Sequence, residues 1–183
     1  MKRIICLALV VLFIDLPVFA QDAAQTKQRP VLVKEIHNFH MVTPGIMRGS
    51  QPKDEAFELL KEYAGVKTVI DLRNEEWQIE KERGVVGRLG MVYVSVPMKG
   101  NEKVSPEVIN QVLSIMTDRS NQPVFIHCMA GKDRTGLVMA AYRIKLEHWS
   151  QDDAVKEMLA YGYDRGCCSA MEESLAEWKD QLK

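Results

Sequence analysis

The segment from Val124 to Gly136, VFIHCMAGKDRTG, constrains the fold of this chain more than any other. Its first residues are β-branched or aromatic, and the residues from Thr135 onward follow an apolar helical pattern. The segment therefore predicts a buried strand, a tight loop and the start of a helix. The N–H groups of such a loop can converge on one point, where the helix dipole adds positive potential. A cysteine at that point, Cys128, would have a lowered pKa, and its thiolate would lie beside a bound tetrahedral anion, ready to attack phosphorus.

The composition fits one globular domain. The 183 residues are enough for one sizeable core, and a hydrophobic content of 46% argues against disorder. The formal net charge of −1 offers no basic field, so we expect no nucleic-acid partner. The four histidines lack metal-ligand spacing backed by carboxylates or thiols, so we predict neither a metal nor another cofactor. The composition leaves the oligomeric state open.

The start of the chain has the pattern of a secretory signal peptide. A basic start at Lys2 and Arg3 precedes an uninterrupted apolar run and a small-residue cleavage site that ends at Ala20. We divide the chain into a signal peptide at residues 1–20, an N-terminal extension at 21–40 and a catalytic domain at 41–183. Because the apolar run is short for a bilayer, we expect export to the periplasm without a stable membrane span, with an uncleaved anchor as the alternative.

Export would leave three cysteines in the mature chain, namely Cys128, Cys167 and Cys168. An odd number leaves at least one thiol free or paired with another molecule. We interpret the adjacent Cys167 and Cys168 as small apolar filler near a helix start. The alternatives are a redox partner for Cys128 and an intermolecular bridge.

Strand and helix signals alternate along most of the chain. The patterns predict strands within 46–52, 66–72, 91–96 and 124–126, and helices within 54–63, 77–89, 105–118, 135–146, 150–161 and 169–182. Strands alternate with helices, and helices alone finish the chain. This order predicts a single α/β domain with a mostly parallel central sheet flanked by helices and a helical C-terminal part. The loop after the last strand then leaves a carboxyl end of the sheet, where ligands bind in open α/β folds.

The motif His127-Cys128-x5-Arg134-Thr135 resembles the signature of the cysteine-dependent protein tyrosine and dual-specificity phosphatases. Gly131 inside the motif, Gly136 after it and the strand-to-helix context strengthen the resemblance. Three more segments resemble small secreted bacterial dual-specificity-like phosphatases: Arg48 to Pro52, Gly65 to Arg73, and Ala141 to Ile144 with Trp149 and Ser150. The resemblance spans roughly residues 42–161 and implies a protein tyrosine phosphatase-like fold.

The resemblance implies roles for the residues of the loop. Cys128 would be the nucleophile that forms a phosphocysteine intermediate, and Arg134 would hold two phosphate oxygens in a bidentate fork. Thr135 would bond the cysteine sulfur, and His127 would orient the loop. The backbone N–H groups of residues 129 to 134 would complete the phosphate cradle, so the expected substrate-binding residues are Met129, Ala130, Gly131, Lys132 and Thr135. The Lys132 side chain would either add charge for a highly anionic substrate or remain solvated.

The general acid is where this sequence departs from the family pattern. The family places an aspartate on a loop upstream of the cysteine, and the matching loop here, residues 97–103, has none. Asp133 and Glu102 are the candidates. We favour Asp133, because a carboxylate beside a bound phosphate has a raised pKa that suits an acid. The alternative is that Asp133 points outward as a charge at the helix N-terminus.

Charged residues also follow another predicted strand. Asp71 and Arg73 lie at its carboxyl end, where they would either brace the site or form a surface ion pair. Arg48 offers the same choice between a bracing role and a surface role.

These features predict a phosphomonoester hydrolase that works through a phosphocysteine intermediate. Its substrate would be a phosphorylated protein or a small phosphomonoester, with phosphotyrosine first and phosphoserine or phosphothreonine next. One alternative is a phosphoinositide or inositol-phosphate phosphatase. Two further alternatives are a sulfurtransferase, which the five-residue spacer before Arg134 disfavours, and a non-catalytic phosphate-binding module, which the intact Cys128 and Arg134 disfavour.

Overall fold

The computed structural model describes residues 31–182. The strands are β1 (His40–Thr43), β2 (Ile46–Gly49), β3 (Thr68–Asp71), β4 (Val92–Ser95) and β5 (Val124–His127). After a short helix at residues 31–35, the helices are α2 (Asp54–Ala64), α3 (Glu76–Arg88), α4 (Pro106–Thr117), α5 (Asp133–Glu147), α6 (Gln151–Ala160), α7 (Arg165–Cys168) and α8 (Ala170–Asp180). The predicted α/β order, with helices alone at the C-terminal end, is confirmed.

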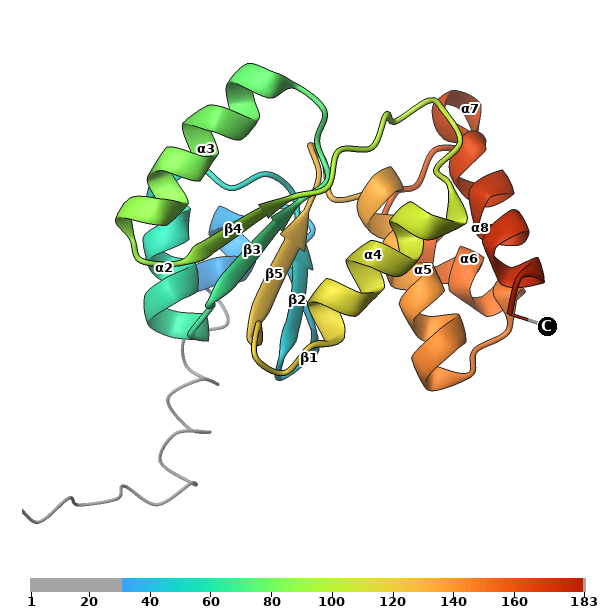
Figure 1. Ribbon diagram of the computed structural model, residues 1–183, viewed down its shortest axis with the longest axis horizontal. Coiled ribbons are helices and arrows are strands. Elements are labelled where there is room, and N and C mark those ends of the chain that lie inside the picture. The colour runs from blue at the N-terminus through green and yellow to red at the C-terminus, as the bar shows by residue number, and fades with distance from the viewer. Residues whose placement is uncertain (1–30, 183) are drawn as a thin grey trace, which may run out of the picture.

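The strands form one sheet in the order β1-β2-β5-β3-β4. β1 runs antiparallel to β2, and the other neighbours are parallel. The register places His127, the last residue of β5, beside Gly49 of β2 and Asp71 of β3. The carboxyl ends of three neighbouring strands therefore meet at one edge of the sheet, the upper edge in Figure 1.

Helices cover both faces of this sheet. In Figure 1, α2 and α3 lie on one side, and α4, α5, α6 and α8 lie on the other. Each face of the sheet packs against its helices in a separate hydrophobic core, and successive residues of β5 alternate between these two cores. Phe125 packs with Phe57 of α2, whereas Val124 and Ile126 pack with the buried side chains of α5. Because both faces are covered, every residue of the central strands β2, β3 and β5 is buried. The helix after the loop, α5, is buried at every residue from Arg134 to Arg143.

The residues before β1 also belong to the packed structure. Leu32, Ile36 and Phe39 are buried and join the core between the sheet and α2. Packing therefore extends N-terminal of residue 41, where the sequence placed the start of the catalytic domain. The expected signal peptide at residues 1–20, and the extension as far as residue 30, lie outside the described residues.

Local signals set several helix ends. The Ser150 hydroxyl accepts a hydrogen bond from the Asp153 N–H at 3.1 Å and so caps the start of α6. Gly65 ends α2 with a φ of 63°. Within residues 31–182, no helix has the length and apolar character needed to span a bilayer.

Candidate active site

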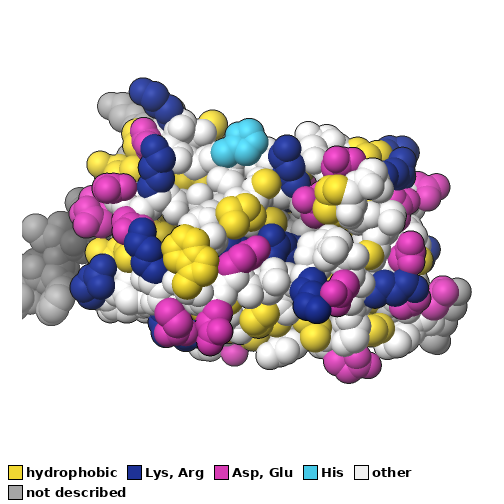
Figure 2. All heavy atoms as spheres, turned by 90° about the horizontal axis from the view of Figure 1, so that it is seen from above, with side chains coloured by type: hydrophobic (Ala, Val, Ile, Leu, Met, Phe, Trp, Pro, Cys, Tyr) yellow, Lys and Arg dark blue, Asp and Glu magenta, His cyan; other side chains and the backbone are white. Residues whose placement is uncertain are grey.

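The loop of residues 128–132 joins β5 to α5 at the edge where three strands end. Cys128 follows β5 directly, and Asp133 is the first residue of α5. Figure 2 looks onto this edge, where basic, acidic and hydrophobic side chains are interspersed. The strand, loop and helix predicted from the sequence are therefore present, and the helix N-terminus points its dipole at the loop.

Four successive carbonyl groups of this loop are hydrogen-bonded to the surrounding scaffold. The carbonyl oxygens of Cys128, Met129, Ala130 and Gly131 accept hydrogen bonds from His127 Nδ1 (3.0 Å), the Gln51 N–H (3.1 Å), Asn38 Nδ2 (3.2 Å) and Arg48 Nη2 (2.8 Å), respectively. Across a planar trans peptide, a carbonyl and the following N–H point in opposite directions. The N–H groups of residues 129–132 therefore face away from these partners, which leaves them free to cradle an anion.

Gly131 makes the tight turn of the loop possible. Its φ is 68°, in the left-handed region that favours glycine. A Cβ at this position would lie 2.5 Å from both the carbonyl carbon and the carbonyl oxygen of Gly49. The loop and the end of β2 can therefore approach one another only if residue 131 has no side chain.

The Cys128 side chain is a buried free thiol, with 2% of its surface exposed. Burial opposes ionisation, but hydrogen bonds from the Thr135 side chain and backbone, the charge of Arg134 and the Gly131 N–H outweigh it and lower the pKa of Cys128. The Thr135 hydroxyl is buried, and apart from the Cys128 sulfur it has no hydrogen-bond partner among the described residues. The thiol is thus prepared to act as a nucleophile.

The Arg134 guanidinium is anchored on one side only. Its Nη1 donates to the Met98 carbonyl at 3.1 Å and to Asn74 Oδ1 at 3.2 Å. Within residues 31–182, Nε and Nη2 have no hydrogen-bond partner. These two nitrogens form the edge that binds two oxygens of one phosphate in a bidentate pair.

A cluster of charged side chains, the buried ion cluster of Asp71, Arg73, Glu82 and His127, lies behind the loop. Arg73 Nη2 is 2.6 Å from both Asp71 Oδ2 and Glu82 Oε2, and Glu82 Oε1 is 2.8 Å from His127 Nε2. Asp71 and Arg73 are fully buried, so they do not form the surface ion pair that the sequence left open. Through Glu82 and His127 they are connected to the carbonyl of Cys128.

Among the described residues, two groups of side chains are close enough together to share a metal ion: Asp133 with Cys167 and Cys168, and three members of the buried ion cluster. One ligand atom each of Asp71, Glu82 and His127 lies within 4.8 Å of the others. The Arg73 guanidinium bonds both carboxylates and so supplies the cation that this grouping needs. Burial would raise the pKa of Asp71, but the hydrogen bonds from Arg73, the charge of His127 and the Tyr93 hydroxyl hold it below its usual value.

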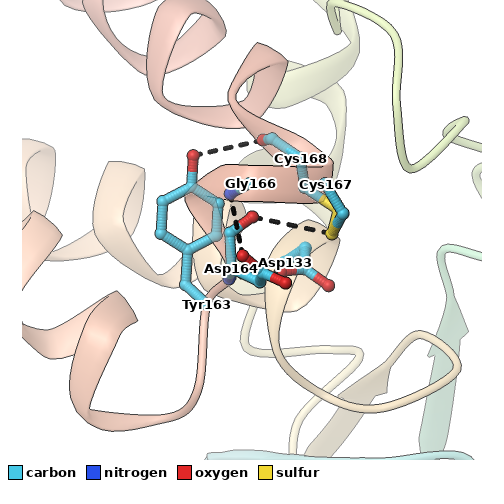
Figure 3. Close-up of a disulfide and its surroundings, with 6 residues drawn as sticks. All are labelled: Asp133, Tyr163, Asp164, Gly166, Cys167 and Cys168. Atoms are coloured by element: carbon cyan, nitrogen blue, oxygen red, sulfur yellow. Dashed lines mark hydrogen bonds between the residues drawn. A yellow bond between two sulfur atoms is a disulfide. The ribbon is translucent and has the colours of Figure 1, made fainter.

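Asp133, the favoured general acid, faces the segment that leads into α7 (Figure 3). Its Oδ1 accepts a hydrogen bond from the Asp164 N–H at 3.2 Å, and no partner of Oδ2 lies within the described residues. Beside it, Cys167 and Cys168 form a disulfide with one another. The interpretation of this pair as apolar filler is therefore wrong, and neither cysteine is bonded to Cys128.

The contacts that Glu102 and Lys132 make within the described residues do not involve Cys128. Glu102 is exposed and forms an ion pair with Lys99 at 2.9 Å. The Lys132 side chain packs against Gly162, where an added Cβ would lie 3.1 Å from Lys132 Cε. Lys132 has no carboxylate partner within residues 31–182, so its charge remains available to a substrate.

Sequence reasoning missed Glu82 and Asn38. Glu82 lies on the buried face of α3 with Ile79 and Val86, and a carboxylate at helical spacing within an apolar stripe was the available signal. Asn38, with a φ of 54°, donates to the carbonyls of both Ala130 and Tyr161. Nothing local in the sequence marks Asn38, because both of its partners are distant along the chain.

The fold and the loop together define a class of protein. A parallel sheet that presents a cysteine and an arginine around inward-facing N–H groups at its carboxyl edge is the architecture of the cysteine-dependent phosphatases. The sequence model of the tyrosine phosphatase family matches residues 33–176, and the chain belongs to this family.

Two curated relatives illustrate the range of the family. The inositol diphosphatase SIW14 of Saccharomyces cerevisiae is 29% identical over 157 residues, which cover 82% of this chain and 54% of SIW14. The dual specificity protein phosphatase TpbA of Pseudomonas aeruginosa is 28% identical over 126 residues, which cover 69% of this chain and 55% of TpbA. The chain thus spans about half the length of these relatives.

Solved structures agree with this assignment. The crystal structure of the core catalytic domain of the PP-IP phosphatase SIW14 with citrate has a TM-score of 0.70 at 28% identity, over 80% of this chain and 88% of that one. The crystal structure of P. aeruginosa TpbA has a TM-score of 0.66 at 22% identity, over 80% of this chain and 92% of that one, and shows likeness of fold alone.

Proposed function

We propose that this protein is a protein tyrosine or dual-specificity phosphatase that hydrolyses phosphate monoesters through a phosphocysteine intermediate. One observation carries the proposal: a thiol with a lowered pKa lies in the loop that leads into α5, and the first turn of that helix holds an arginine whose Nε and Nη2 have no partner among the described residues. Membership of the tyrosine phosphatase family and similarity to a dual specificity protein phosphatase support it.

The chemistry proceeds in two displacements at phosphorus. The Cys128 thiolate attacks, a sulfur–phosphorus bond forms, and the ester oxygen leaves with a proton from the general acid. The N–H groups of residues 129–132 and Arg134 stabilise the charge on the three remaining oxygens. Water then attacks phosphorus and gives a proton to the carboxylate that the general acid became in the first step, the sulfur–phosphorus bond breaks, and the Thr135 hydroxyl stabilises the departing thiolate. Inorganic phosphate is the product.

We propose Asp133 as the general acid, with Glu102 as the alternative. Asp133 lies beside Arg134, and only its Oδ1 is engaged by the protein within the described residues. Glu102 belongs to the loop that also anchors Arg134 through Met98, but it is exposed and paired with Lys99. Asp133→Asn should lower turnover of an alkyl phosphate by about a hundredfold or more, whereas Glu102→Gln should change it little. Wild-type turnover in Asp133→Asn would refute this assignment.

An inositol that carries a diphosphate group is the second candidate substrate. The inositol diphosphatase SIW14 is 29% identical over 82% of this chain, and Lys132 supplies a cation without a carboxylate partner among the described residues. This substrate would use the same displacement, with a phosphate in place of the ester oxygen as the leaving group. A lower pKa of the leaving group would also reduce the need for a general acid.

The proposed chemistry is tested by turnover of p-nitrophenyl phosphate. The wild type should be active and inhibited by vanadate, and Cys128→Ser should lose at least about a thousandfold in activity. Arg134→Lys, which keeps the charge and loses the fork, should lose a similar amount. Absence of wild-type turnover would favour a non-catalytic phosphate-binding module.

A panel of phosphopeptides, phosphoinositides and inositol diphosphates tests the substrate class. A phosphotyrosine peptide should have the highest kcat/KM if the leading proposal holds. Preference for an inositol diphosphate, lost selectively in Lys132→Ala, would support the second candidate instead. Lys99→Ala is the matched control, since Lys99 is already paired with Glu102.

We also propose that the protein is exported to the periplasm. The support is the basic start, apolar run and cleavage pattern that end at Ala20. N-terminal sequencing of the protein recovered from a periplasmic fraction should begin at Gln21. Retention of Met1 in a membrane fraction would instead identify an uncleaved anchor.

A further inference from the structure

Glu82 lies behind the catalytic loop, and the proposed reaction does not use it. It belongs to α3, is 5% exposed and forms a hydrogen bond with His127, the residue before the nucleophile. A carboxylate is costly to bury unless it is paired and hydrogen-bonded. Both of its oxygens are bonded, one to Arg73 and one to His127. The position of Glu82 therefore calls for an explanation in terms of what it does to His127.

Both ring nitrogens of His127 face oxygens that accept hydrogen bonds. Nδ1 lies 3.0 Å from the carbonyl oxygen of Cys128, which cannot donate. Nε2 lies 2.8 Å from Oε1 of Glu82, a carboxylate whose other oxygen accepts a hydrogen bond from Arg73 at 2.6 Å. Both nitrogens therefore carry protons, and the ring is an imidazolium.

The charge balance of the buried ion cluster also indicates that the His127 ring is protonated on both nitrogens. Asp71 and Glu82 supply two negative charges, Arg73 supplies one positive charge, and a protonated His127 supplies the second. The Tyr93 hydroxyl donates to Asp71 and is neutral, since burial and this hydrogen bond raise the pKa of Tyr93. Burial would lower the pKa of His127, but the charge and hydrogen bond of Glu82 and the charge of Asp71 raise it.

We propose that Glu82 is a positioning residue of the phosphatase reaction, which holds the His127 ring in its doubly protonated form and in one orientation behind the nucleophile. This inference rests on the proposed phosphatase function. The oriented ring donates to the Cys128 carbonyl and so holds this carbonyl on the side of the loop away from the phosphate cradle. The next N–H, that of Met129, therefore points toward the cradle. The ring's positive charge also stabilises the Cys128 thiolate in a site with little water to screen it.

The thiolate titration of Cys128 tests this role without a substrate. Ultraviolet absorbance of the thiolate is followed against pH, and the spectrum of Cys128→Ser is subtracted to isolate this one thiol. In Glu82→Gln the midpoint should rise by about one pH unit, because the ring loses the charge that keeps it protonated. The matched control is Glu80→Gln, the same change on the exposed side of α3, which should titrate as the wild type does.

A conservative variant separates charge from packing. Glu82→Asp keeps the carboxylate, so its midpoint should stay nearer to that of the wild type than the midpoint of Glu82→Gln. A midpoint in Glu82→Gln equal to that of the wild type would overturn the proposal. So would an equal rise in Glu82→Asp and Glu82→Gln, because the shift would then follow side-chain shape rather than charge.

A second measurement does not depend on the folding of any variant at position 82. Imidazole NMR of the wild type should show His127 doubly protonated well above pH 6.5, the ordinary pKa of histidine. Titration of His127 at its ordinary pKa would overturn the proposal. If these results are as expected while no phosphate ester is hydrolysed, the phosphatase function is wrong, and the electrostatic role of Glu82 toward Cys128 stands.

Discussion

At the scale of single residues, the catalytic loop depends on one position without a side chain. Gly131 combines a φ of 68° with a close approach to the Gly49 carbonyl. Its own carbonyl accepts the hydrogen bond from Arg48. The conformation of this one residue therefore controls the direction of the N–H groups on either side of it.

Gly131→Ala should impair both stability and activity. The strained φ and the contact at 2.5 Å should lower the free energy of unfolding by about 2 kcal/mol. A small displacement of the cradle should reduce kcat/KM by at least about tenfold. Urea unfolding and p-nitrophenyl phosphate turnover measure the two effects. The control is Gly87→Ala in α3, where nothing lies within 4 Å of the added Cβ, and equal effects of the two variants would contradict the prediction.

At the scale of secondary-structure elements, the loop is held by several elements rather than by its own sequence. Arg48 of β2 is almost fully buried, donates to the Gly131 carbonyl and stacks over the Tyr161 ring at 4.0 Å. Asn38, just before β1, joins the same loop to the end of α6. The sheet edge and α6 thus fix the loop from two sides.

Arg48→Lys should therefore be destabilising although it keeps the charge. Lysine cannot stack on Tyr161 and donate to Gly131 in the same geometry, so the free energy of unfolding should fall by about 2 kcal/mol. Arg83→Lys is the control, because Arg83 also lies over a tyrosine ring but is exposed. It should cost less than about 0.5 kcal/mol. Similar urea midpoints for the two variants would show that burial of Arg48 contributes nothing.

At the scale of the whole molecule, the buried ion cluster makes stability depend on pH in both directions. The pKa of Asp71 is held below its ordinary value of 3.8, so its contribution is present above that value and is lost as the pH falls through the lowered pKa. The pKa of His127 is raised above 6.5, so its contribution is complete below 6.5 and is lost as the pH rises through the raised pKa. Asp71 and His127 together therefore favour the folded state most between about pH 3.8 and pH 6.5.

The alkaline side is best measured in Cys128→Ser. The lowered pKa of Cys128 makes its contribution grow with pH, which opposes the loss at His127. Without that thiol, the free energy of unfolding should fall as the pH rises above about 7, with a slope of at most about 1.4 kcal/mol per pH unit. Adding Glu82→Gln should flatten the slope. A slope that survives this second change would mean that His127 is not its source.

The features of this fold that the sequence predicts are those set by residues close together along the chain. Four of the five strands, most helix ends and the loop from Cys128 to Lys132 were predictable, because hydrophobic period, caps and turn residues act over a few positions. β1 was not predicted, because it has no buried residue and no apolar run marks it, and α7, with four residues, is too short to give a helical period. The resemblance supplied the roles of Cys128 and Arg134 because both lie within one motif.

The amino-acid sequence by itself determined the α/β class, the position of the loop and the place of Cys128 in it, since all of these depend on neighbours along the chain. Only the tertiary structure decided which groups hold the loop: Asn38 reaches the Ala130 carbonyl across 92 positions of sequence, and Glu82 reaches His127 across 45. It also decided that Asp71 and Arg73 are buried and that Asp133 faces Asp164. Such partners are brought together by the folding of the sheet and its two helical layers, and no local pattern encodes a contact of that range.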